Sequence, residues 1–410
     1  MYIESPSGND SECNNTPLTT VAMRRIYVDH AATSWPKPTA VWDAVDRYQR
    51  DLGAPAGRGT YAEAIEVDRL VGETRRRVAM LLGTPDSRQV VFTYSGTDAL
   101  NQAIYGLVTR GSHVIATEAE HNSVLRPLRA LEASGDVESF LAPCDGCGVV
   151  SPDDIQDAIR ANTSLIVLTQ ASNVTGALQP VAEVARIAKE HGIPLLVDAA
   201  QSLGHGIASP VGLGATVVAA PGHKGCLGPL GTGILYIDPQ WTARLDPLRR
   251  GGTGTQSESD LQPESMPERY EAGSLNVPGL VGLGAGLKSV LDRGEAELRE
   301  HQVGLTRSLL EGLSEIPQLT VYGPREADRR VGVVSFGLAE IEPQDLAAIL
   351  ESSYRIQVRA GLHCSPRMHR ALGTLKKGGT VRISFGLSNS QEDVTAILVA
   401  LREIAVGFAA

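Results

Sequence analysis

The 410-residue sequence is short of positive charge and of long apolar runs. Asp and Glu number 47 against 37 Lys and Arg, which gives a formal net charge of −10. An acidic chain is a poor match for nucleic acid or an anionic membrane surface. No apolar run approaches the roughly 18 residues that a membrane-spanning helix needs. The sequence therefore predicts neither a nucleic-acid partner nor a membrane partner.

Cysteine is also scarce, with five residues scattered along the chain. Five is too few for a disulfide framework, which favours a reducing compartment, and we expect the cytoplasm. Residues 1–23 are polar and acidic without the apolar core of a signal peptide, so we predict a loose tail that contains Cys13. Cys144 and Cys147 form a C-x-x-C, but no second pair has zinc-like spacing. We predict a turn there rather than a redox or metal site, no metal elsewhere, and no role for Cys226.

Apolar residues make up 42% of the chain, and its length suffices for one large and one smaller domain. From about Arg25 to Pro239, short apolar runs alternate with helical patterns such as Thr97–Val108 and Val181–His191. This alternation predicts an α/β fold with a mostly parallel sheet. The expected strands are Gln89–Thr93, His113–Thr117, Ser164–Thr169, Leu195–Val197, Thr216–Ala219 and Gly233–Ile237.

The pattern changes at a segment rich in Gly, Ser and Pro, Gly251–Pro267. A long helical stretch follows, roughly Val277–Glu315, and then shorter strands at Gly332–Phe336 and Val381–Ser384. We therefore predict a large domain over residues 24–265 and a smaller C-terminal α+β domain over 266–410. The stretch up to about Gly59 is expected to cross between them.

A lysine follows an apolar strand in the glycine-rich turn Pro221-Gly-His-Lys-Gly-Cys-Leu-Gly. Glycines let the backbone approach a ligand closely, and Lys224 held there is placed to form a Schiff base with a carbonyl group. The alternative is an ordinary surface lysine. The neighbouring His223 is either a phosphate contact or a packing histidine.

A carboxylate ends the preceding strand in Leu195-Leu-Val-Asp-Ala-Ala-Gln201. Open α/β sheets bind ligands at the carboxyl ends of their strands. In a pyridoxal-phosphate site Asp198 would pair with the ring nitrogen and keep it protonated, and Gln201 would reach the phenolic oxygen. The alternative is an aspartate that caps a helix.

A strand, a tight turn and a helix start follow one another around Gly96 and Thr97. Free backbone N–H groups at a helix start bind phosphate, and Thr97 adds a hydroxyl, although the same residues also suit plain helix capping. His121 follows another strand, at the same expected edge of the sheet, where its ring is placed to stack on a cofactor.

Together these segments resemble the class V aminotransferase fold, and specifically the cysteine desulfurases with a short active-site loop. The resemblance runs from Ile26 to the C-terminus, and it implies a pyridoxal-phosphate-dependent transferase of fold type I. The matching stretches are Tyr27–Pro38, Gly57–Gly59, Glu120–Pro127, Ala171–Gly176, Asp198–Gln201, Gly222–Gly225, Glu271–Asn276 and Arg359–Pro366.

The resemblance also implies roles for individual residues. Lys224 carries the cofactor and moves the Cα proton, Ser274 reaches the phosphate of a partner subunit in a homodimer, and Cys364 is the nucleophile. Pro221 and His30 depart from the residues more usual at their positions. The remaining expected contacts are Asp198 with the ring nitrogen, Gln201 with the ring hydroxyl, His121 on the ring face, Gly96, Thr97 and His223 at the phosphate, and Asn173, Arg359 and Arg382 at the substrate carboxylate.

The expected activity is the conversion of L-cysteine to L-alanine with a persulfide on Cys364, followed by transfer to a sulfur-acceptor protein. This chemistry needs a thiolate, so we expect positive charge from Arg359 and His363 beside Cys364. The plainer interpretation is a small buried cysteine. Two other functions stay open: a C–S or C–Se lyase acting on a cysteine conjugate or selenocysteine, which needs no Cys364, and a scaffold that binds a partner.

Overall fold

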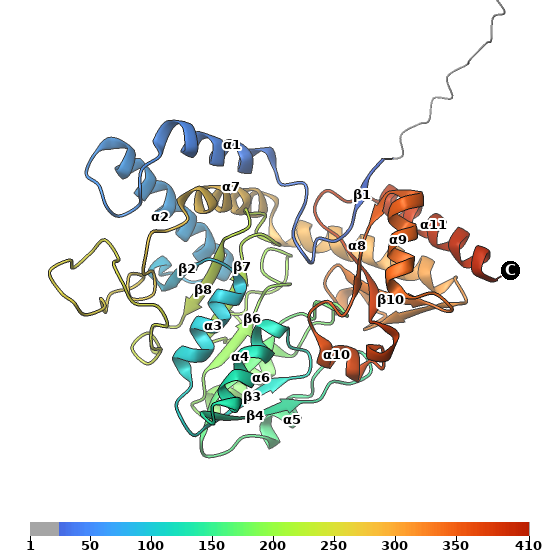
Figure 1. The fold of residues 1–410 in the computed structure, drawn as a ribbon, viewed down its shortest axis with the longest axis horizontal. Coiled ribbons are helices and arrows are strands. Elements are labelled where there is room, and N and C mark those ends of the chain that lie inside the picture. The colour runs from blue at the N-terminus through green and yellow to red at the C-terminus, as the bar shows by residue number, and fades with distance from the viewer. Residues whose placement is uncertain (1–23, 410) are drawn as a thin grey trace, which may run out of the picture.

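A computed structural model describes residues 24–409 (Figure 1). The predicted tail over residues 1–23, with Cys13, lies outside the described residues. The core is a seven-stranded sheet in the order β2-β8-β7-β6-β5-β3-β4, in which only β8 runs antiparallel to its neighbours. The mostly parallel α/β sheet is thus confirmed. Its strands are β2 Val90–Thr93, β3 Ser112–Thr117, β4 Val137–Ala142, β5 Thr163–Thr169, β6 Leu195–Asp198, β7 Val217–Pro221 and β8 Gly233–Ile237.

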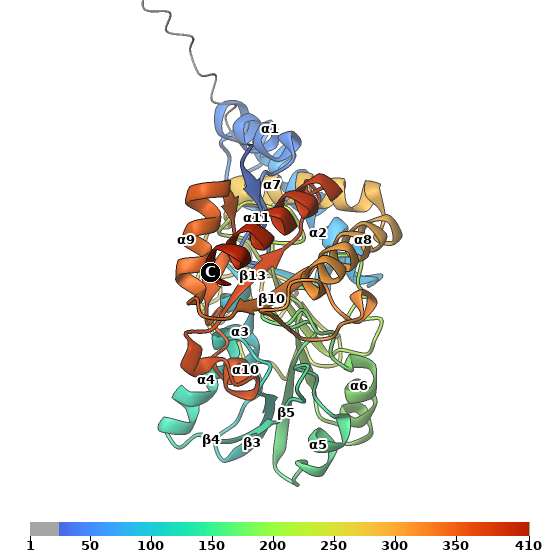
Figure 2. The same cartoon turned by 90° about the vertical axis from the view of Figure 1, so that its right-hand side faces the viewer.

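The central strands are apolar throughout because helices cover both faces of the sheet. Side chains alternate between the faces along each strand, so Val217 and Ala219 of β7 pack under α3 and α4, while Val218 packs on the other side. Figures 1 and 2 show the helices around the sheet. They are α1 Thr39–Arg47, α2 Ala62–Leu82, α3 Gly96–Leu107, α4 Asn122–Ala133, α5 Pro152–Asp157 and α6 Val181–Glu190, with a π-helical turn at Tyr48–Leu52.

The six expected strands of this sheet are confirmed to within one or two residues at their ends, but β4 was not predicted. It is an edge strand in which only the two end residues are buried. A half-exposed edge strand carries no continuous apolar run, so nothing in its composition marks it.

The expected single helical stretch over Val277–Glu315 is wrong. It consists of two helices, α7 Val277–Arg293 and α8 Glu295–Ser314. Gly294 separates them at φ 80°, a conformation that ends one helix and precedes the next. Leu283 and Leu287 of α7 lie in the same apolar cluster as the residues of α2.

A second sheet has the antiparallel order β12-β13-β10-β9. The N-terminal strand β1, Ile26–Tyr27, pairs with β11, Ile356–Gln357, and Val28 joins the apolar cluster of this second unit. The boundary expected at residue 265 remains a prediction. The other elements are β9 Leu319–Tyr322, β10 Val333–Leu338, β12 Arg359–Gly361, β13 Thr380–Ser384, α9 Pro343–Tyr354, α10 Pro366–Ala371 and α11 Gln391–Ala409.

No helix within residues 24–409 combines the length and the apolar character needed to cross a membrane.

Candidate active site

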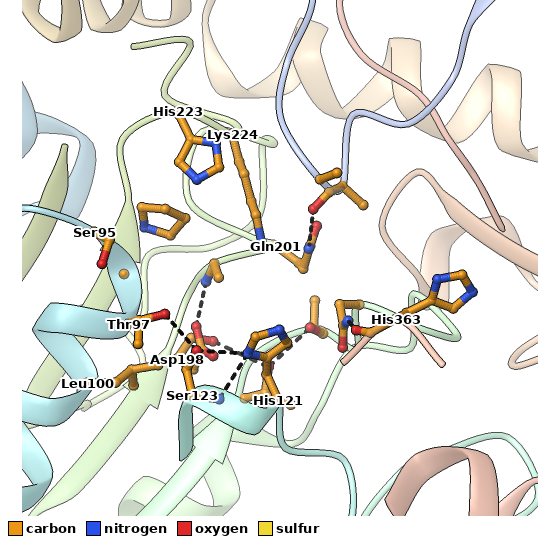
Figure 3. Close-up of a pocket in the computed structure, with 18 of the residues that line it drawn as sticks. Ser95, Thr97, Leu100, His121, Ser123, Asp198, Gln201, His223, Lys224 and His363 are labelled. Carbon is orange, nitrogen blue, oxygen red and sulfur yellow. Dashed lines mark hydrogen bonds between the residues drawn. The ribbon is translucent and has the colours of Figure 1, made fainter. Parts of the chain in front are cut away.

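A cavity of about 250 Å³ lies at the carboxyl edge of the seven-stranded sheet, facing the smaller sheet (Figure 3). Five parallel strands, β2, β3, β5, β6 and β7, each lead into a segment that lines it. Cys364 lies in an adjoining groove, and Ser274 lines neither space. The predicted site residues brought together here are Gly96, Thr97, His121, Asn173, Asp198, Gln201, His223, Lys224, Arg359 and Arg382.

Lys224 stands in the turn between β7 and β8, which glycines allow to pack tightly. A Cβ on Gly225 would lie 2.2 Å from the carbonyl oxygen of Leu203, and a Cβ on Gly222 would lie 2.3 Å from Thr232 Oγ1. Burial lowers the pKa of Lys224 to about 8, while the nearby charge of Asp198 acts in the opposite direction. A larger fraction of this amine is thus in the neutral, nucleophilic form at physiological pH than in an ordinary lysine.

The N-terminal segment fixes this turn through one backbone atom, a contact that the sequence did not reveal. Lys37 Nζ donates to the His223 carbonyl oxygen at 2.7 Å, and the Ser34 N–H donates to it at 3.1 Å. Burial lowers the pKa of Lys37 to about 8. Lys37 and Ser34 both lie in Tyr27–Pro38, one of the stretches that carry the family resemblance. That resemblance was the only feature of the sequence that pointed to them.

Asp198 ends β6 as a nearly fully buried carboxylate that accepts the Ala200 N–H at 2.9 Å. Burial raises its pKa, and the charge of Lys224 partly offsets this. A buried carboxylate is costly unless a cation or donor pairs with it. A protonated ring nitrogen is such a donor. Gln201 gives one amide N–H to the Ala31 carbonyl at 3.0 Å, which leaves its second N–H for a ligand oxygen.

The start of α3 forms the opposite end of the cavity. Ser95 caps the helix by accepting the Asp98 N–H at 3.0 Å, and Thr97 Oγ1 lies 2.7 Å from Ser123 Oγ. A Cβ on Gly96 would lie 3.0 Å from both Pro221 Cδ and Pro221 N, so this position needs a glycine. The free N–H groups at this helix start are suited to a phosphate.

His121 caps α4 through its own ring, because Nδ1 accepts the Ser123 N–H at 3.0 Å. Burial, helped by the positive charges of Lys224 and Arg359, lowers the pKa of His121 to about 4. The ring is therefore neutral, and the assigned hydrogen bond at Nδ1 puts its proton on Nε2.

Two arginines lie directly opposite each other on the paired strands β12 and β13, Arg359 and Arg382. Like charges in such a cross-strand pair repel, and an anion relieves the repulsion. Asp29 partly does so, since Arg382 Nη2 donates to Asp29 Oδ1 at 2.6 Å. Arg382 Nη1 also donates to the Asn173 carbonyl at 3.0 Å, while its buried Nε has no hydrogen-bond partner within residues 24–409. The pair retains positive charge for a substrate carboxylate.

The loop that carries Cys364 is held in an unusual backbone conformation. His363 and Cys364 have φ values of 48° and 61°, which lie in the left-handed region of backbone conformation that residues other than glycine rarely adopt. The amide of Asn173 donates to the His363 carbonyl at 2.6 Å and accepts from Ser365 Oγ at 2.7 Å. The Asn122 N–H donates to the Cys364 carbonyl at 2.8 Å. These contacts fix the thiol at the edge of the cavity.

Only one of the two cations expected beside Cys364 is present. Arg359 Nη2 lies 3.5 Å from Cys364 Sγ, as expected. The expectation for His363 is wrong, because burial and the charge of Arg382 lower its pKa well below the usual value and leave it neutral. The ring bonds Thr380 Oγ1 at 3.1 Å instead.

Glu120 is a buried acid for which sequence analysis predicts no role. Its Oε1 accepts from Thr117 Oγ1 at 2.8 Å and from the Thr169 N–H at 2.9 Å, whereas Oε2 has no partner. Burial raises the pKa of Glu120 to about 8, so the carboxyl is protonated at neutral pH.

Glu120→Gln should therefore change how stability depends on pH. Wild type must take up a proton to fold between the usual pKa of 4.5 and about 8. Its free energy of unfolding then falls with rising pH by up to about 1.4 kcal/mol per unit. Glutamine needs no such proton. The free energy of unfolding of the variant, measured in urea, should therefore rise relative to that of wild type between pH 5 and pH 8. If the difference in free energy of unfolding between variant and wild type stays constant across this pH range, Glu120 is not a buried neutral acid.

Cys144 and Cys147 lie in a short hairpin turn, as predicted. Cys144 pairs with Val150 across the hairpin, and Asp145 Oδ1 accepts the Cys147 N–H at 2.8 Å. Burial raises the pKa of Cys144 to about 12, which makes its thiol unreactive. Residues 24–409 contain no group of three or more His, Cys, Asp and Glu arranged to hold a metal ion.

Comparison with known proteins agrees with this geometry. Residues 26–397 match the family model for class-V aminotransferases. A probable cysteine desulfurase of Methanothermobacter thermautotrophicus is 37% identical over 384 residues, which cover 93% of this chain and 94% of that one. A cysteine desulfurase of Yersinia pseudotuberculosis is 32% identical over 92% of this chain and 93% of its own.

Solved structures give the same result. An apo structure of a cysteine desulfurase from Thermococcus onnurineus has a TM-score of 0.86 at 33% identity and covers 93% of this chain and 95% of its own. One from Escherichia coli, in an S-sulfonic acid form, has a TM-score of 0.84 at 27% identity, with coverage of 94% and 95%. The chain belongs to the class-V aminotransferase family and, within it, to the cysteine desulfurases.

Proposed function

We propose that this chain converts L-cysteine to L-alanine with pyridoxal phosphate bound to Lys224 and with the sulfur passing to Cys364. The observation that carries the proposal is the fixed Cys364 loop beside a cavity that contains Lys224. The cavity fits the cofactor, since its lining brings together Lys224, the buried carboxylate of Asp198 and the helix start at Gly96. When bound, the cofactor withdraws electrons from the substrate Cα.

The residues of the chain then bind and orient the substrate. Arg382 and Arg359 attract the carboxylate of L-cysteine, and Asn173 both supports Arg382 and holds the Cys364 loop. Lys224 Nζ, with a pKa of about 8, takes the Cα proton and returns protons during release of alanine. His121 Nε2–H provides a neutral donor on the cofactor face.

Cys364 accepts the sulfur. Its thiolate attacks the substrate Sγ, the Cβ–Sγ bond breaks, and a new S–S bond forms on Cys364. The electron pair of the broken bond stays with the carbon skeleton, which takes up protons and leaves as alanine. Arg359, 3.5 Å from Cys364 Sγ, balances the negative charge on sulfur before and after transfer.

The purified protein and L-cysteine alone test this function. With a thiol reductant, alanine and sulfide should appear in equal amounts over many turnovers. With one equivalent of L-cysteine per site and no reductant, alanine should form without free sulfide, because the sulfur stays on Cys364. A C–S or C–Se lyase that does not use Cys364 would instead release sulfide without reductant, or would turn over only a conjugate or selenocysteine.

The same proposal includes a homodimer, because Ser274 is exposed and does not line the cavity of its own chain. Its segment is anchored: Glu271 forms a two-pronged ion pair with Arg75 at 2.7 and 2.9 Å, and Tyr94 Oη donates to the Ser274 carbonyl at 3.0 Å. A rigid segment that presents a hydroxyl outward suits the phosphate site of a partner. We further propose a cytoplasmic location and a protein or small thiol as sulfur acceptor.

Ser274→Ala should weaken cofactor retention without changing turnover at saturating cofactor. One hydrogen bond to a charged phosphate contributes roughly 1.5–3 kcal/mol. Release of pyridoxal phosphate during dialysis should thus be faster than from wild type, and Ser259→Ala, elsewhere on the surface, provides the control. Unchanged retention, or a fully active monomer in dilute solution, would contradict the shared site.

A further inference from the structure

An open groove of about 500 Å³ adjoins the cavity and has Cys364 at one end. It runs between α3 and α4, which lie side by side in Figure 1. Thr97, Asn101 and Tyr105, four residues apart, place one face of α3 along it. This volume lies within the range of small-molecule sites.

Among the described residues that line the groove, one side chain is charged, Arg126 of α4. Arg126 is exposed, and it lies one helical turn beyond Asn122, whose N–H holds the Cys364 carbonyl. Its positive charge also contributes, after burial, to lowering the pKa of His121, which places the guanidinium near the cavity.

The acids of the two helices are already paired with other arginines. Asp98, the only acid of α3, bonds Arg249, and Glu132, the only acid of α4, bonds Arg129. Among residues 24–409, Arg126 thus forms no ion pair, and the described lining of its groove contains no acid, on a protein of net charge −10. This arrangement attracts a small anion into the groove that Cys364 lines.

We propose that Arg126 selects the thiol that removes sulfur from Cys364, and that the preferred acceptor is a small thiol with a carboxylate. The inference rests on the proposed function. The acceptor thiolate attacks the outer sulfur of the Cys364 persulfide, and the S–S bond to Cys364 Sγ breaks. Cys364 leaves as a thiolate, and the outer sulfur becomes the persulfide of the acceptor. Arg126 is a specificity residue and takes no part in the release of alanine.

Single-turnover transfer tests the proposal on the holoenzyme. The persulfide is first formed with L-cysteine and excess substrate is removed, after which its decay is followed by mass with 3-mercaptopropionate or with its neutral amide. Arg126→Gln should slow transfer to the carboxylate by roughly threefold, as expected for an exposed ion pair, and leave the amide rate unchanged. The ratio of wild-type to variant rates for each thiol cancels the intrinsic difference in thiol reactivity.

Three further variants complete the test. Arg126→Lys should keep the preference, Arg126→Glu should reverse it in favour of cysteamine, and Arg129→Gln, on the same helix, should behave as wild type. Added salt should reduce the wild-type preference. Equal effects of Arg126→Gln on both thiols would overturn the selector role while the desulfurase function stands. If no persulfide forms on Cys364, both proposals fail.

Discussion

Lys224→Ala should bind no cofactor covalently and should lose turnover of L-cysteine. Lys224 is the only lysine among the described residues that line the cavity, and its lowered pKa supplies the neutral amine needed both for attachment and for proton transfer. Loss of a positioned acid–base group lowers the rate by roughly 100- to 10,000-fold, and loss of attachment adds to this.

Borohydride reduction followed by mass spectrometry checks the prediction. Wild type should retain the cofactor mass on the peptide of Lys224, and the variant should retain none. Lys288→Ala replaces an exposed lysine on α7 and should match wild type. A Lys224→Ala protein with wild-type activity would refute the assignment of this residue.

Cys364→Ala should bind L-cysteine but release neither alanine nor sulfide. The variant keeps Lys224, Asp198 and the arginine pair, so binding and its spectral change persist, whereas Sγ of the substrate has no acceptor. Cys147→Ala removes an exposed thiol from a hairpin and should remain fully active. If Cys364→Ala converts L-cysteine at the wild-type rate, Cys364 is a packing residue and the protein acts as a C–S lyase instead.

Much of the fold could be predicted because strands buried on both faces read as continuous apolar runs. The same logic failed for β4, whose exposed side chains interrupt the run, and at Gly294, which divides a helical pattern through backbone geometry alone. The local pattern of apolar residues thus predicts buried strands and helices better than it predicts exposed strands or the turns that divide helices.

The cavity-lining part of the site was predictable because its residues follow directly after strands, and strand ends converge on one edge of a parallel sheet. Contacts between segments far apart in sequence were not predictable. The hydrogen bond from Lys37 to the His223 carbonyl joins residues 186 apart in sequence, and the one from Asn173 to the Cys364 loop joins residues 190 apart. The neutrality of His363 likewise depends on burial that its sequence context does not reveal.

The central claim is that sulfur passes to Cys364. The most direct test mixes the wild-type holoenzyme with one equivalent of L-cysteine per site, without reductant, and measures the mass of the peptide that contains Cys364. That peptide should gain the mass of one sulfur atom, with one alanine formed per site, and a reductant should reverse the gain. Alanine formation with an unmodified Cys364 peptide would contradict it.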